Sequence, residues 1–209
     1  MPKHLHFFLF SFLFGWSTHI AYAQALACSG YFLRNQSKDT VATSIMVPMK
    51  DKRIEFRKLQ WRVTVKDPFS TIDLDKMPGD IREFGFSYNG KRYVYWTVPN
   101  PFDKTGPGNK TYDKMFLRLI KPGYCKIFAG YTEIPGVNME GKPSKQDLLL
   151  KANNKEWLVI KAGNAKEDLL FYFADFPSLV EKIKNNIYTE KDIEKVVSEY
   201  NQFKKNNLK

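Results

Sequence analysis

Apolar and polar residues alternate along most of the chain up to about residue 161, with the period of two that is typical of β-strands. The clearest example is residues 83–98, EFGFSYNGKRYVYWTV, where the aromatic residues occupy every second position on both sides of Asn89-Gly90. Asn-Gly favours the positive φ angles of a type I′ turn, whose twist matches the strands it joins. We therefore expect a β-hairpin in this segment.

Three other segments repeat this pattern around a turn: RIEFRKLQWRVTVK at 53–66, FLRLIKPGYCKIFAGYTE at 116–133 and DLLLKANNKEWLVIKA at 147–162. Many short strands joined by such turns favour an antiparallel sheet that curls or closes into a barrel, here with about eight to ten strands. We assign residues 24–163 to this β domain.

The apolar pattern changes to the period of a helix after residue 164. Pro177 is acceptable in the first turn of a helix, where its missing N–H is not needed, and Thr189 with Asp192 resembles a capping box. The apolar positions that follow a helical spacing are Leu169, Leu170, Phe173, Ile193, Val196, Val197 and Tyr200. Residues 164–209 should form two or three short helices packed on the sheet, which makes the fold class α+β.

The N-terminus has the layout of a secretory signal. Residues 7–16, FFLFSFLFGW, form an apolar core of about ten residues, half of what a transmembrane helix needs. Ala21-Tyr22-Ala23 provides the small residues of a cleavage site, so we assign residues 1–23 to a removed signal. The alternative is a lipoprotein cut before Cys28, although Ala25 stands where an aliphatic residue is usual. Either way we expect an exported protein, periplasmic or secreted, without a transmembrane span.

The exported chain keeps two cysteines, Cys28 and Cys125. Cysteine pairs tend to close in an oxidising compartment, so we expect a disulfide between an N-terminal strand and the core. Two separate thiols are the alternative.

Removal of the signal also removes all three histidines, His4, His6 and His19. A mature chain without histidine excludes Ser-His-Asp and Cys-His relays and every histidine-ligated metal site. No CxxC motif is present either, so we expect no metal, no cofactor and no catalytic residue of these classes.

Carboxylates are the remaining catalytic candidates. Asp73, Asp75, Asp80 and Glu83 lie in one short stretch, and a suitably spaced pair is what glycoside hydrolysis requires. The spacing of Asp73 and Asp75 also fits one solvated face of a strand, which is the simpler interpretation. A carboxylate-dependent glycan hydrolase is therefore the alternative function.

The chain carries a net charge of +11, spread among acidic residues rather than gathered in one stripe, and has no nucleic-acid motif. Such a charge can attract an exported protein to an anionic envelope component, but a soluble charged surface is the simpler interpretation. The partner is unknown from the sequence, and the candidates are an anionic envelope component or another envelope protein. Tyr93, Tyr95, Trp96 and Trp157 are candidate contact surfaces for a ligand, with packing in the core as the alternative role. The function we expect is a non-catalytic envelope or secreted protein that binds an unknown ligand or serves a structural role.

Five short motifs follow one another along the chain: SGYFLRNQSKDTVATSI, DIREFGF, FLRLIKPGYCKIFAGY, FYFADFPSLVEKI and IEKVVSEYN. Together they cover most of residues 29–202. In this order they resemble the motifs of a group of small Bacteroidota-type exported proteins of unknown function. The chain departs from the group at Phe176, where a cysteine is common. The resemblance implies export and a β-rich body with a helical tail, and it implies no catalytic residue.

Overall fold

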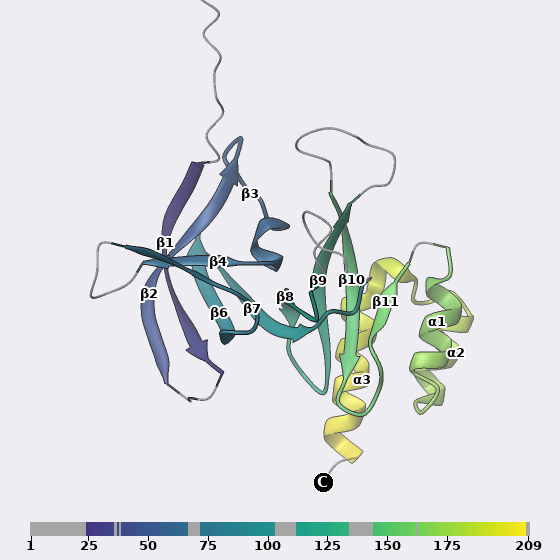
Figure 1. Ribbon diagram of the computed structural model, residues 1–209. Helices are drawn as coiled ribbons and strands as arrows, with labels where there is room; N and C mark the ends of the chain where they lie inside the picture. Colours follow the sequence, from purple (N-terminus) through teal and green to yellow (C-terminus); the bar gives the residue numbers. More distant parts are fainter. Residues whose placement is uncertain are drawn as a thin grey trace, which may run out of the picture.

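The computed structural model describes residues 24–35, 37, 39–66, 72–102, 112–133, 144–161 and 163–207. The signal assigned to residues 1–23 lies outside these ranges. The described chain forms one antiparallel sheet of eleven strands followed by three short α-helices (Figure 1). The predicted α+β class, with a curled sheet and C-terminal helices, is therefore confirmed.

The strands are β1 (Gln24–Arg34), β2 (Thr40–Lys50), β3 (Arg53–Ile54), β4 (Val63–Lys66), β5 (Asp73–Lys76), β6 (Ile81–Tyr88), β7 (Lys91–Pro99), β8 (Lys114–Lys121), β9 (Cys125–Glu133), β10 (Ser144–Ala152) and β11 (Leu158–Ile160). The α-helices are α1 (Ala165–Tyr172), α2 (Pro177–Lys184) and α3 (Ile193–Asn207), and two 3₁₀ turns are η1 (Lys58–Gln60) and η3 (Glu190–Asp192). The strand order is β11-β10-β9-β8-β7-β6-β1-β2-β4-β5, with β3 beside β2, and the two end strands do not pair with each other. The sheet is thus curled but open.

The turns follow the chemistry of their residues. Asn89 and Gly90 both have positive φ, 49° and 72°, as the predicted β6–β7 hairpin requires. Pro177 lies in the first turn of α2, and Thr189 and Asp192 form the predicted capping box at the start of η3. These local predictions are confirmed.

The first core cluster fills the inner side of the curl made by β1, β2, β4, β6 and β7. Its largest members are aromatic: Phe84 stacks on Tyr95 across β6 and β7, with ring centroids 4.6 Å apart. Strand β1 leaves no room for a side chain at Gly30, where it pairs with β6. A Cβ on Gly30 would lie 2.7 Å from Ile45 Cγ1 and closer still to the carbonyl oxygen of Gly85. Glycine at residue 30 permits this close approach.

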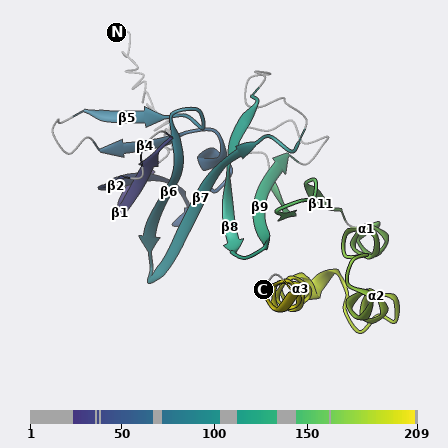
Figure 2. The same cartoon turned by 90° about the horizontal axis from the view of Figure 1, so that it is seen from below.

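The second core cluster lies between the sheet and the helices. Figure 1 shows α3 beside β9 and β10, and Figure 2 shows α1 and α2 beyond β11 at the end of the sheet. The apolar residues predicted for the helices supply the stripe that packs on the strands, since Leu169, Phe173 and Tyr200 are all buried there. Cys125, Ile127 and Leu150 supply the strand side of the same cluster.

Side-chain amides complete the hydrogen bonding of β9 at both of its ends. The amide of Asn201, from α3, accepts from the Cys125 backbone N–H at 2.7 Å and donates to the Cys125 carbonyl at 2.9 Å. The amide of Gln60, from η1, makes the same two contacts with the backbone of Tyr131. Each amide takes the place that a neighbouring strand would occupy.

A charged network also joins α3 to the rest of the chain. The carboxylate of Asp175 accepts hydrogen bonds from Lys155 Nζ at 2.6 Å, Lys204 Nζ at 2.5 Å and the Tyr200 hydroxyl at 2.8 Å. Burial acts to raise the pKa of Asp175, but these three donors outweigh it and hold the pKa well below its ordinary value. The ionised carboxylate is therefore the form that the folded protein favours.

The predicted disulfide is wrong. Cys28 and Cys125 are both free and buried, and they belong to different core clusters. Strands β6, β7 and β8 separate β1 from β9; each step between neighbouring strands is about 4.8 Å, whereas a disulfide needs Cα atoms within about 7 Å. Burial raises the pKa of the Cys125 thiol to about 12, so it remains protonated.

Candidate functional site

Two of the predicted contact residues, Tyr93 and Tyr95, lie on the same face of β7, and this face points to the inner side of the curl. The register of β7 with β8 sets Tyr95 opposite Arg118. Arg118 lies two residues after Phe116 on the same face of β8, so a charged residue follows a buried aromatic one. This position defines the candidate site.

The guanidinium of Arg118 lies among aromatic rings rather than beside an acid. Its carbon is 4.5 Å from the centre of the Phe56 ring and 5.9 Å from that of Tyr93. Its Nη2 donates to Gln146 Oε1 at 3.2 Å, while its Nε is buried without a partner among the described residues. Arg118 forms no ion pair with any described residue, and the described groups that contact its guanidinium are ring faces and one amide oxygen.

Two tyrosine hydroxyls add further donors beside this guanidinium. The Tyr131 hydroxyl donates to the same Gln146 oxygen at 3.0 Å, and the Phe56 and Tyr131 rings stack 5.6 Å apart. Tyr95 is completely buried, and its hydroxyl has no partner in the described part of the chain. Burial raises the pKa of both hydroxyls, and the nearby Arg118 charge opposes the shift only in part. Both therefore remain neutral donors at neutral pH.

We name the group formed by Phe56, Tyr93, Tyr95, Arg118, Tyr131 and Gln146 the Arg118 cluster. Its parts come from β7, β8, β9, β10 and the segment before η1, and the Gln60 amide holds the Tyr131 backbone in place. The cluster contains several donors, one shared acceptor and no carboxylate. Chemically it suits the binding of an anion and lacks a nucleophile paired with a base.

The other two predicted contact residues, Trp96 and Trp157, lie on the opposite face of the sheet. Their rings cover the buried Phe128, with centroid distances of 6.0 Å from Trp96 and 5.3 Å from Trp157. Lys126 Nζ lies 5.8 Å from the Trp96 ring. The structure thus separates the four predicted aromatics into two pairs, and the tryptophan pair covers core side chains.

The first two candidate carboxylates, Asp73 and Asp75, are exposed on the edge strand β5. They lie opposite Lys66 and Thr64 of β4, on the outer face of the sheet. Asp75 accepts from Thr64 Oγ1 at 2.5 Å and from Arg62 Nη1 at 3.3 Å. This arrangement agrees with the solvated strand face considered from the sequence.

The remaining two, Asp80 and Glu83, are also engaged locally. Asp80 accepts from the Met77 backbone N–H at 2.7 Å, and Glu83 accepts from the Tyr31 hydroxyl at 2.5 Å. Within the described ranges, no three Cys, His, Asp or Glu side chains gather closely enough to hold a metal ion. Asp75, Asp80 and Glu83 are thus each hydrogen-bonded to neighbouring residues.

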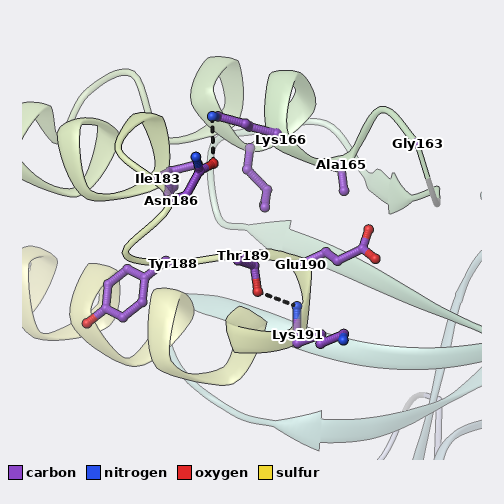
Figure 3. Close-up of a pocket in the computed structure, with 10 residues that line it drawn as sticks. Gly163, Ala165, Lys166, Ile183, Asn186, Tyr188, Thr189, Glu190 and Lys191 are labelled. Atoms are coloured by element: carbon purple, nitrogen blue, oxygen red, sulfur yellow. Dashed lines mark hydrogen bonds between the residues drawn. The ribbon is translucent and has the colours of Figure 1, made fainter.

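A separate cavity of about 460 Å³ lies between α1, the end of α2 and η3 (Figure 3). Its floor is apolar and buried, formed by Ala165, Leu169 and Ile183. At its rim, Lys166 Nζ donates to Asn186 Oδ1 at 2.7 Å and to the carbonyl oxygen of Lys184 at 2.9 Å. Lys166 thus joins α1 to the end of α2 at the rim of this cavity.

Sequence reasoning identified Tyr93 and Tyr95 but missed Phe56, Arg118, Tyr131 and Gln146. One signal was available for Arg118, because it is the charged residue in an alternating row with Phe116 and Ile120. The other members come from distant segments and meet only through the curl of the sheet.

Comparisons of the chain with models of protein families, with curated proteins and with solved structures found no match. The resemblance to Bacteroidota-type exported proteins therefore stays a prediction. Among the helices described, none has both the length and the apolar character that crossing a membrane requires.

Proposed function

We propose that this protein is an exported, non-catalytic binding protein of the cell envelope or the extracellular space. The observation that carries the proposal is the Arg118 cluster, in which a half-buried arginine has aromatic neighbours and no acidic partner among the described residues. Even partial burial of a charge without a counter-ion has a desolvation cost. Its presence is therefore better explained by a ligand than by stability.

Export is proposed from the secretory layout of residues 1–23 and from the resemblance to exported proteins. The contacts of Asp75, Asp80 and Glu83 give no geometric support to a glycan hydrolase. The partner class proposed from the sequence, an anionic envelope component, fits a cluster rich in hydrogen-bond donors.

The test is expression of the complete chain in a Gram-negative host, followed by cell fractionation and measurement of the intact mass. We expect a chain that begins at Gln24 in the periplasm or the medium, with two thiols that react with an alkylating agent only after unfolding. A full-length cytoplasmic protein would contradict export, and a chain that begins at Cys28 with acyl groups would make it a lipoprotein.

Catalysis is tested on the same material by measuring reducing ends released from peptidoglycan and from envelope polysaccharide. We expect no release above that of a heat-denatured sample. Release that disappears in Asp75→Asn or Glu83→Gln would replace the binding function by the hydrolase.

A further inference from the structure

We propose that the Arg118 cluster binds the acidic group of an organic anion, a carboxylate or a phosphate attached to an apolar body. This inference rests on the proposed binding function and names the ligand class. It is carried by the geometry around one guanidinium and by the donors there that exceed the acceptors of the described chain.

Donors outnumber acceptors in the cluster. Arg118 Nη2 and the Tyr131 hydroxyl converge on a single acceptor, the Oε1 atom of Gln146, at 3.2 Å and 3.0 Å. Arg118 Nε and the Tyr95 hydroxyl have no acceptor in the described chain. An anion supplies the missing acceptor capacity, since a carboxylate or phosphate accepts several hydrogen bonds at once.

The exposed side of the cluster is the side of Gln146, whose side chain is open to solvent. An anion arriving there replaces the neutral amide oxygen as the acceptor for Arg118 and Tyr131. Hydrogen bonds between a guanidinium and an anionic oxygen are shorter and stronger than those to an amide. The exchange therefore favours the bound state.

Aromatic rings around the guanidinium define the rest of the ligand. Phe56 lies 5.6 Å from both the Tyr93 ring and the Tyr131 ring, and all three are partly exposed. Such rings bind flat or aliphatic surfaces and do not favour a fully hydrated ion. The ligand is thus expected to carry an apolar body next to its acidic group.

Other arginines of the chain differ from Arg118 in their surroundings. Arg62 pairs with the carboxylate of Asp75, and Arg92 donates to the Tyr31 hydroxyl, which itself donates to Glu83. Arg92 also lies over an aromatic ring, at 5.4 Å from the centre of Tyr31, but on the other face of the sheet. Arg92→Met is therefore a matched control for Arg118→Met, because it also removes one positive charge beside a tyrosine.

The experiment is a ¹H–¹⁵N NMR titration of the mature chain that follows the Arg118 Nε–H resonance, identified by its loss in Arg118→Met. The probes are benzoate and phenyl phosphate, with benzyl alcohol as the uncharged control and inorganic phosphate as the control without an apolar body. We expect saturable shifts with benzoate or phenyl phosphate, and the stronger of the two identifies the acidic group. Binding of both controls should be at least about tenfold weaker.

Three variants test the assignment. Arg118→Met should weaken binding of the preferred probe at least about tenfold, followed through backbone amides of β7 and β8, because hydrogen bonds to a charged group are lost. Arg118→Lys should bind with intermediate affinity, since it keeps the charge but loses the planar fork. Arg92→Met should bind like the wild type.

Equal binding of benzyl alcohol and benzoate would overturn the inference, and so would unchanged binding in Arg118→Met. Should Arg118→Met fail to fold, Arg118→Lys and Tyr131→Phe provide the same comparison with smaller changes. A chain that is exported and processed but binds none of the probes contradicts this inference alone, whereas a chain retained in the cytoplasm contradicts the proposed function.

Discussion

Asn201 joins α3 to the end of β9 through its side-chain amide, and Asn201→Ala tests how firmly this contact holds the last helix. The substitution leaves the backbone N–H and carbonyl of Cys125 without their partners at 2.7 Å and 2.9 Å. Cys125 is completely buried, and the N–H of its neighbour across the sheet, Ala152, donates to the Tyr172 hydroxyl instead. No other strand of the described sheet is therefore placed to take over these two groups.

An unpaired buried polar group costs about 1 to 3 kcal/mol. Two such groups, partly relieved by water that enters the space of the lost side chain, give an expected loss of about 2 to 4 kcal/mol in the free energy of unfolding. The assay is equilibrium unfolding in urea, followed by circular dichroism. Asn206→Ala on the exposed side of the same helix is the control and should change the free energy by less than about 0.5 kcal/mol. A loss in Asn201→Ala no larger than in this control would refute the reasoning.

Two further predictions concern the sheet and the charged network. Gly30→Ala should lower the free energy of unfolding in urea by about 1 to 3 kcal/mol, because its Cβ would press on Ile45 and on the Gly85 carbonyl. Gly79→Ala is the control and should be nearly neutral, since its Cβ would meet nothing within 4 Å. The pKa of Asp175 is lower in the folded than in the unfolded chain, so its stabilising effect is present above the unfolded pKa of about 4 and is lost as the pH falls below it. The difference in unfolding free energy between wild type and Asp175→Asn should therefore shrink between pH 5 and pH 3, and a constant difference would contradict the role given to this carboxylate.

Local patterns in the sequence predicted local structure well. The Asn89-Gly90 turn, the capping box at Thr189 and the apolar stripe of α3 all depend on residues within a few positions of one another. Three of the four predicted strand pairs form, β6 with β7, β8 with β9 and β10 with β11, because their turns fix which residues meet. The pair expected within residues 53–66 is wrong, since β3 and β4 both pair with β2 and the 3₁₀ turn η1 lies between them. The strand number expected, about eight to ten, falls just below the eleven that are described.

The pattern of apolar and polar residues did not predict contacts between distant segments. The disulfide prediction failed because nothing in the sequence shows that three strands separate Cys28 from Cys125. Tyr93 and Tyr95 were chosen for their aromatic character, yet their link to Arg118 depends on the register between β7 and β8. The roles of Gln60 and Asn201 are equally hidden, since a polar amide in a helical turn is an ordinary surface residue until the strand it meets is known.

The two amides that border β9 also set an order of events while the chain is synthesised. Gln60 precedes β9 in the chain, whereas Asn201 follows it and belongs to α3. Chains leave the ribosome from the N-terminus onward, so Gln60 is available when β9 emerges and Asn201 is not. The hydrogen bonding of β9 is therefore complete only once α3 has been made, and α3 closes the junction between the sheet and the helices.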